Sequence, residues 1–218
     1  MAEWYPLLLK LEGKTCVVFG GGPVAERKAG GLLQANADVR IVSPRITVTL
    51  REWADAGRLH WEEREAEDGD VDDAVLVFAA TNRPEINRRM CELARRRAIP
   101  ANIADEGEEG DFLVPAVLRR GGLVLTASAT GASPALATRI IDELAVRYGQ
   151  EYNENIEVLK IIRSIVKAEV PDPAERRELL QAAVTDEALS EWRSTSWQND
   201  KSRLVARLRQ RANDRRDR

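Results

Sequence analysis

The sequence is short of metal-binding and disulfide-forming residues. Its 218 residues contain two cysteines, Cys16 and Cys91, and a single histidine, His60. The cysteines lie far apart without metal-type spacing, and Cys16 falls within an apolar run, so we interpret it as a core thiol. No cluster of histidines and cysteines could hold zinc. We therefore expect a protein of a reducing compartment with no metal site of its own.

Long apolar runs and a strong net charge are lacking as well. No run approaches membrane-spanning length, and residues 1–6 lack the basic and apolar regions of a signal peptide. The formal net charge of −3 argues neither for nor against nucleic acid, so any basic surface must be local. We expect a cytoplasmic protein without a membrane or nucleic-acid partner.

The most informative stretch is a glycine cluster, which a β-branched apolar run enters and a helical pattern leaves. Gly20, Gly22 and Ala25 fill the small positions of a G-x-G-x-x-G/A turn. In such a turn the second glycine lets a pyrophosphate touch backbone, and the following helix directs its N–H groups at the phosphates. A plain tight loop is the alternative, but the strand before and the helix after favour a nucleotide site.

The N-terminal half alternates strand-like and helix-like patterns. Strand, helix and strand within about thirty residues predict parallel strands with a right-handed crossover. Open parallel sheets bind ligands at their carboxyl edge, and Asp105 follows the last expected strand there. The expected strands are 15–19, 39–42, 59–61, 75–80 and 100–104; the expected helices are 24–33, 50–56 and 85–97; the lead-in 4–11 is expected to pack on the sheet edge.

After residue 111 the pattern changes. Residues 112–118 and 123–128 alternate like the two strands of a hairpin, and Ser133 with Pro134 begins a helix to about residue 148. Two or three helices are expected in 151–193. We interpret the basic tail from Lys201, with its thin apolar stripe, as a solvated or frayed helix rather than a nucleic-acid-binding element.

Several ordered motifs together suggest a family. They are the G-G-G-x-V-A-x-R-K block at 20–28, A-A-T-N at 79–82, N-I-A-D at 102–105, D-F-L-V-P-A at 111–116 and S-P-A-L-A at 133–137. With them the chain resembles the precorrin-2 dehydrogenase/sirohydrochlorin ferrochelatase family, the siroheme-synthase module. The motifs cover residues 4 to about 150, and the rest matches only as a helical appendage of similar length.

The resemblance implies a fold, an activity and partners. The family oxidises precorrin-2 to sirohydrochlorin with NAD⁺, some members then insert Fe²⁺ as a second substrate, and the protein is a homodimer that binds tetrapyrroles. The implied fold is α/β in three parts. These are an NAD-binding Rossmann-type parallel-sheet domain at 1–111, a small α+β dimerisation region at 112–150, and a helical C-terminal domain with the basic tail at 151–218.

The resemblance also assigns site residues. The family's important aspartate falls on Asp105. The cofactor contacts fall on Gly22, Pro23 and Val24 beside Gly20, on Ser43, Pro44 and Arg45, and on Thr81 and Asn82. From the chemistry alone, removing two hydrogens needs a hydride acceptor, which nicotinamide supplies, and a proton acceptor such as a carboxylate. His60 is expected in an edge strand away from the carboxyl edge, so we interpret it as structural. A helix cap or salt-bridge role for Asp105 stays open.

A polyanionic tetrapyrrole needs cations and N–H donors. Candidate substrate-binding residues are Arg119, Arg120 and Arg139, together with Ser128, Thr130, Gly131 and Ser133 in a loop that leads into a helix N-terminus. Taken singly, each has an ordinary reading as an exposed hairpin arginine or a helix cap.

Two features depart from a simple dinucleotide site. No acid follows the second strand to bind a ribose hydroxyl, and Arg45 there could accept a 2′-phosphate, so NADP is an alternative to NAD. Near Asp105, the side chains of Glu106, Glu108 and Glu109 would raise its pKa if they were close in space. A chelatase-only relative and a non-enzymatic nucleotide-sensing Rossmann module are the rival functions.

Overall fold

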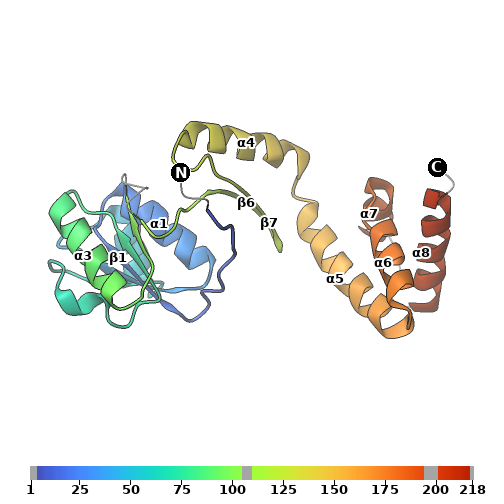
Figure 1. The fold of residues 1–218 in the computed structure, drawn as a ribbon, viewed down its shortest axis with the longest axis horizontal. Helices are drawn as coiled ribbons and strands as arrows, with labels where there is room; N and C mark the ends of the chain where they lie inside the picture. Colours follow the sequence, from blue (N-terminus) through green and yellow to red (C-terminus); the bar gives the residue numbers. More distant parts are fainter. Residues whose placement is uncertain (1–3, 105–109, 194–200, 217–218) are drawn as a thin grey trace. The chain divides into compact units, whose positions relative to one another are not determined.

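The computed structural model describes residues 4–104, 110–193 and 201–216, and Figure 1 shows its elements along the chain. The chain divides into two compact units. The first contains residues 1–114 and 130–132, and the second contains residues 115–129 and 133–218. We describe each unit by itself. The predicted three-part division at residues 111 and 150 stays a prediction.

The first unit contains one parallel sheet of five strands in the order β3-β2-β1-β4-β5. The central strand β1 pairs with β2 on one side and with β4 on the other, so the chain crosses over β1 between β3 and β4. This reversal of the strand order makes the sheet Rossmann-like, as predicted. The strands are β1 (Thr15–Phe19), β2 (Asp38–Val42), β3 (His60–Glu62), β4 (Leu76–Ala79) and β5 (Ala101–Ile103). The helices are α1 (Pro23–Gln34), α2 (Val48–Asp55) and α3 (Pro84–Arg96), with a 3-10 turn, η1 (Asp68–Val71).

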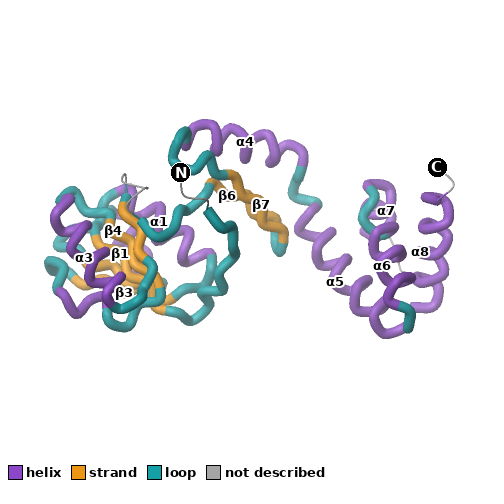
Figure 2. Tube along the Cα trace, in the orientation of Figure 1, coloured by secondary structure: helices purple, strands orange, loops and turns teal. Residues whose placement is uncertain are grey.

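The central strand β1 is buried on both faces, which explains its continuous apolar run. Cys16 and Val18 face the core layer that α1 covers, whereas Val17 and Phe19 face the layer that α3 covers. Figure 2 shows these helices on the two sides of the sheet. Burial raises the pKa of the Cys16 thiol to about 11, so this cysteine stays a neutral core residue.

The edge strand β3 is held by an ion-pair network. Arg64 forms ion pairs with Glu62 and, at 2.7 Å, with Asp70, while Arg40 donates to the main-chain oxygen of Asp70 at 2.6 Å. Burial alone would raise the pKa of Asp70, but hydrogen bonds from Arg64 and the Glu67 amide, with the charge of Arg64, hold it below its usual value. The network ties β3 to the turn η1.

The pH dependence of stability follows from this network. A carboxyl whose pKa is lowered in the folded state stabilises the fold above its unfolded pKa of about 3.9, and this contribution is lost as the pH falls through the folded value. We expect Asp70→Asn to lower the unfolding free energy by about 1–3 kcal/mol at pH 7. Thermal unfolding by circular dichroism should show the gap from wild type narrowing below about pH 4. Asp73→Asn, at an exposed neighbouring position, is the control; a gap independent of pH would contradict the assignment.

The second unit begins with an antiparallel hairpin and continues as helices. The hairpin turn is packed on the start of α5 (Tyr152–Glu169), because a Cβ at Gly122 would lie 2.8 Å from Ile156. Arg120 Nε also donates to the oxygen of Tyr148, directly after α4 (Pro134–Arg147), at 3.1 Å. The strands are β6 (Ala116–Arg120) and β7 (Leu123–Ala127). The helices are α4 (Pro134–Arg147), α5 (Tyr152–Glu169), α6 (Pro173–Ala182), α7 (Asp186–Arg193) and α8 (Lys201–Arg216).

The C-terminal helix α8 differs from the expectation of a solvated tail. Leu204 and Leu208 of its apolar stripe are buried against α5, α6 and α7. Arg207 and Arg211 both pair with Glu191 of α7, and hydrogen bonds, first from Arg207 and then from Arg211, lower the pKa of that carboxyl despite its partial burial. The basic charges of the tail therefore dock a packed helix.

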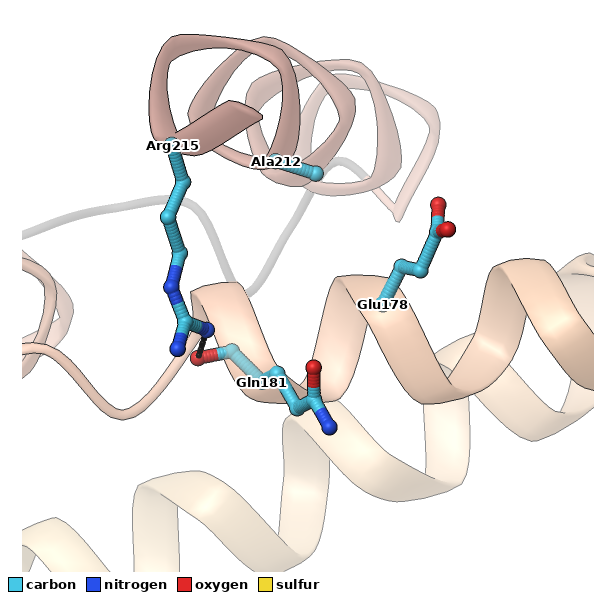
Figure 3. A pocket seen from close by; sticks show the side chains of 4 residues that line it. All are labelled: Glu178, Gln181, Ala212 and Arg215. Atoms are coloured by element: carbon cyan, nitrogen blue, oxygen red, sulfur yellow. Dashed lines mark hydrogen bonds between the residues drawn. The ribbon is translucent and has the colours of Figure 1, made fainter. Parts of the chain in front are cut away.

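A hollow lies between α6 and α8. Figure 3 shows it lined by Glu178, Gln181, Ala212 and Arg215. Arg215 donates to the main-chain oxygen of Gln181 at 3.1 Å, so this arginine also attaches α8 to α6. None of the predicted site residues lines the hollow.

Two further expectations need correction. Residues 4–10 are exposed, and only Leu11 of the lead-in reaches the core, so the lead-in does not pack on the sheet edge as a whole. The first hairpin strand begins at Ala116 rather than at residue 112, because Phe112 belongs to the core of the first unit. Its ring meets Phe78 edge-on at 5.3 Å between centroids.

Candidate functional site

The carboxyl edge of the parallel sheet brings together three stretches that the sequence singled out. They are the glycine turn after β1, the loop after β2 and the turn after β4. Main-chain bonds extend the strand pairing by one residue, from Gly20 N to Val42 O at 3.1 Å and from Ala80 N to Phe19 O at 2.8 Å. The three stretches are therefore side by side at the point where the strand order reverses, which is where open α/β sheets bind ligands.

The three glycines of the turn have different surroundings. Gly20 has a φ of +114°, and a Cβ there would collide with the carbonyl of Ala80. A Cβ at Gly21 would collide with the carbonyl of Arg45. At Gly22 a Cβ would meet no atom within 4 Å. The first two glycines thus permit backbone packing, and Gly22 alone faces open space.

Helix α1 starts directly at this open space. Gly22 is its N-cap, Pro23 is its first residue, and among the described residues no side chain caps it. The first main-chain bond of the helix runs from Glu26 N to Gly22 O at 3.0 Å, so the amides of Val24 and Ala25 precede it. Amides at a helix start with no side chain in front of them suit an anionic group.

The loop after β2 is fastened to the glycine turn. Ser43 is buried, and its hydroxyl donates to the Arg45 oxygen at 2.7 Å, so its side chain is used inside the protein. Thr47 donates its amide to Gly21 O at 2.9 Å and its hydroxyl to Glu26 Oε2 at 2.6 Å. Of the predicted contacts here, only Pro44 and Arg45 are exposed at the edge.

The turn after β4 is organised by a residue that sequence reasoning missed. Asn87, buried in α3, accepts from the amide of Thr81 at 3.1 Å and from its hydroxyl at 2.7 Å. It also donates to the Thr81 oxygen at 3.0 Å. The predicted contact Thr81 therefore directs its polar groups into the protein, while Asn82 is exposed. The signal was present, because Asn87 precedes Met90, Cys91 and Ala94 on the buried stripe of α3.

The predicted catalytic residue Asp105 and its neighbours Glu106, Glu108 and Glu109 lie outside the described residues. The chain on either side is fixed to the sheet, by a bond to β4 before the gap and by bonds to β5 after it. Ala104 N donates to Ala79 O at 2.9 Å, and Asp111 accepts from the Ala101 amide, also at 2.9 Å, and pairs with Arg95.

Beside these contacts, Asn102 donates to the Phe112 oxygen at 2.9 Å, while its buried Oδ1 has no partner among the described residues.

The candidate tetrapyrrole-binding residues are divided between the units. Thr130 and Gly131 belong to the first unit and have positive φ values of 48° and 90°. Arg119, Arg120, Ser128, Ser133 and Arg139 belong to the second unit.

Among the candidates of the second unit, Arg120 donates to the Tyr148 oxygen, as described above, and two more have partners of their own. The Ser133 hydroxyl caps α4 by accepting from the Leu136 amide at 3.2 Å, and Arg139 pairs with Glu143 at 3.1 Å. The ordinary reading of these two residues thus has a structural basis. Their substrate role stays a prediction.

Other groups contribute little to a site. His60 lies in the edge strand β3 as expected, and its ring is mostly exposed, 3.9 Å from Glu62. Within residues 4–104, 110–193 and 201–216, no group of three or more His, Cys, Asp or Glu side chains could hold a metal ion. None of the described helices is both long and apolar enough to cross a bilayer.

Comparison with known proteins identifies the family. Residues 7–116 match a family described as "Putative NAD(P)-binding". The chain is 34% identical over 188 residues to siroheme synthase of Thioalkalivibrio sulfidiphilus, covering 84% of this chain and 38% of that protein. It is 33% identical to siroheme synthase of Pseudomonas aeruginosa strain LESB58, covering 86% and 41% of the two. The chain belongs to the siroheme synthase and precorrin-2 dehydrogenase family.

A solved structure agrees with this family. The protein described as "SirC, precorrin-2 dehydrogenase" superposes with a TM-score of 0.75 at 26% identity, covering 94% of this chain and all of that one. The chain spans about two fifths of the length of the siroheme synthases it matches. The comparison thus concerns one module of those longer proteins.

The described residues fit the NAD(P) that the family binds. A dinucleotide needs a place where its diphosphate can touch backbone, and the space over Gly22 at the start of α1 offers one. Pro44, Arg45 and Asn82 are exposed at the same edge of the sheet. The open space over Gly22 can therefore accept the anionic centre of a dinucleotide.

The contrast between two glycines gives a test. Gly22→Ala places a methyl group in the open space at an ordinary φ of −86°, so we expect the fold to lose less than about 1 kcal/mol and the NAD⁺ affinity to fall at least tenfold. Gly20→Ala should lower the melting temperature clearly because of its positive φ and the collision with Ala80. Calorimetric titration measures the NAD⁺ affinity, and thermal unfolding measures the melting temperature of each variant. Unchanged NAD⁺ affinity in a folded Gly22→Ala protein would remove the diphosphate from this turn.

Proposed function

We propose that the chain is a precorrin-2 dehydrogenase that converts precorrin-2 to sirohydrochlorin with NAD⁺. The supporting observation is the turn at the carboxyl edge, where Gly22 opens onto an uncapped helix start, in a chain of which 94% matches a precorrin-2 dehydrogenase. The matched siroheme synthases have the same module within a longer protein.

Each group of candidate site residues has its own role in the proposed reaction. NAD⁺, when bound, would supply the hydride acceptor. Gly22 and the first turn of α1 would hold its diphosphate, Pro44 and Arg45 would lie beside one ribose, and Asn82 would lie beside the other half of the dinucleotide. Asp105, which follows β5 in the sequence, takes the proton that leaves the substrate with the hydride. The acidic substituents of the tetrapyrrole contact Arg119, Arg120 and Arg139 and the loop Ser128, Thr130, Gly131 and Ser133.

We favour NAD⁺ over NADP⁺ because the family that the chain resembles uses NAD⁺. The sequence has no acid directly after β2 that would bind a ribose hydroxyl of NAD⁺. Arg45 is exposed there, which would suit a 2′-phosphate. Initial rates with each coenzyme separate the two. A kcat/KM at least tenfold higher with NAD⁺ supports the assignment, and the reverse order overturns it.

Fe²⁺ insertion into sirohydrochlorin is the second proposed activity. Here Fe²⁺ is a substrate, and the insertion needs a base for the pyrrole protons, for which Asp105 is again the candidate. A chelatase-only relative would insert iron without using NAD⁺. Anaerobic incubation of sirohydrochlorin with Fe²⁺ and no coenzyme, followed by absorbance, measures this step alone.

The catalytic assignment predicts a specific loss of turnover. Asp105→Asn should bind NAD⁺ as wild type does but lose at least 100-fold in kcat, because proton transfer has lost its acceptor. Anaerobic formation of sirohydrochlorin from precorrin-2 and NAD⁺ is the assay. Asp38→Asn is the control, since Asp38 lies at the opposite, amino end of β2. Wild-type turnover in Asp105→Asn would remove the role of Asp105, and a wild-type protein that folds and binds NAD⁺ without turnover would overturn the dehydrogenase.

We also propose a homodimer formed through the second unit. Its two-stranded hairpin is marginal alone, and α4 leaves Leu136 and Ile140 about two-fifths exposed, as is Val117 of β6. A second copy of the chain would cover these apolar side chains.

The dimer has a direct test. Light scattering after gel filtration should give twice the chain mass of 24.3 kDa. Ile140→Glu should shift the protein toward the monomer because it places a charge in the apolar contact. Val184→Glu, at an exposed apolar position between α6 and α7, is the matched control. A wild-type monomer at micromolar concentration would contradict the proposal.

A further inference from the structure

The turn between β4 and α3 lacks the usual means of ordering a helix start. The N-cap Arg83 makes no side-chain capping bond within the described residues, and the first helical residue, Pro84, has no N–H. A turn of this kind at a ligand-binding edge would ordinarily sample several conformations. Something else must hold it.

The side chain of Asn87 takes this place. It lies one turn inside α3, is 6% exposed, and satisfies both main-chain groups of Thr81 as well as its hydroxyl. One buried amide therefore fixes the conformation of the residue that follows β4 and Ala80. The hydroxyl of Thr81 in turn accepts from Arg83 N at 3.1 Å, so the order extends to the helix start.

The fixed turn lies against the glycine turn. The site where a Cβ would stand on Gly20 is 3.0 Å from Thr81 N, the same atom that donates to Asn87 Oδ1. A shift of Thr81 toward Gly20 would close the switch point between β1 and β4, and a shift away would move Asn82 from the edge. The amide of Asn87 thus sets the position of the Thr81–Asn82 turn relative to Gly20 at the carboxyl edge.

We propose that Asn87 is a positioning residue for the dinucleotide. It does not touch the cofactor; it holds the Thr81–Asn82 turn in the conformation that receives it, so that binding pays no ordering cost. The proposal rests on the proposed function, because it concerns the site in which that function places NAD⁺. It assigns a role to a residue that is neither in the glycine turn nor exposed at the edge.

Two variants at this position make the test. Asn87→Ala removes all three bonds. Asn87→Asp keeps the acceptor for Thr81 N–H and hydroxyl but sets a carboxylate oxygen against the Thr81 carbonyl. The donor returns when that carboxyl group takes up a proton. We expect the Kd for NAD⁺ to rise about five- to tenfold in Asn87→Ala, with a parallel rise in KM for NAD⁺ and an unchanged KM for precorrin-2.

The control separates positioning from general loss of stability. Asn155 is likewise buried, in α5 of the second unit, where it accepts from Arg193 at 2.8 Å. Asn155→Ala should lower the melting temperature and leave the Kd for NAD⁺ within twofold of wild type. For Asn87→Asp, the ratio of its Kd for NAD⁺ to the wild-type Kd should fall toward one as the pH is lowered and the carboxyl group takes up a proton. A purely structural role would not produce this trend.

The outcomes are distinct. A folded Asn87→Ala protein whose Kd for NAD⁺ stays within twofold of wild type overturns the inference and leaves the proposed function intact. If that variant does not fold, Asn87→Asp decides by the same criterion and by its pH trend. A wild-type protein that does not bind NAD⁺ overturns the proposed function together with this inference.

Discussion

The carboxyl edge of the sheet depends on two places where backbone packs directly on backbone. Gly20 lies against the carbonyl of Ala80, and Gly21 lies against the carbonyl of Arg45, with no room for a Cβ at either position. These contacts bring the turn after β4 and the loop after β2 onto the start of α1. Because two neighbouring loops are packed against the turn, the one glycine left open, Gly22, faces the space where a ligand can reach backbone. The proposed cofactor site is a consequence of that packing.

Much of this arrangement could be predicted from sequence, because it rests on local patterns. The buried run of β1, the small residues of the turn and the spacing of α1 each depend on a few neighbouring residues, and together they specify a parallel Rossmann-like sheet. The place of Gly21 could not be foreseen. The motif treats that position as variable, and the restriction comes from Arg45, which is 24 positions away in the sequence and approaches only after folding.

The polar residues of the core show the same limit. Asn87 occupies a buried stripe of α3 where an apolar side chain would ordinarily pack. The structure explains this polar residue, because its amide group bonds to Thr81. The basic tail shows the converse error. Its charge predicts solvation, but Glu191 of α7 attracts Arg207 and Arg211, and the thin apolar stripe of α8 is sufficient once three other helices cover it. In both cases a tertiary partner decides, Thr81 six positions before Asn87 and Glu191 on a different helix from Arg207, rather than local composition.

The chain matches one module of longer siroheme synthases and the full length of the chain described as "SirC, precorrin-2 dehydrogenase". The first unit carries the proposed dinucleotide edge, and the second contains a hairpin and α4 with exposed apolar side chains that suit a protein contact. Candidate substrate residues fall in both units.

The most direct test of the central claim is a crystal structure of the protein with bound NAD⁺. The account predicts diphosphate oxygens within hydrogen-bonding distance of the main-chain amides of Gly22 and Val24, with the dinucleotide lying along the carboxyl edge between Arg45 and Asn82. A dinucleotide bound elsewhere, or an edge at Gly22 filled by protein side chains, would contradict it.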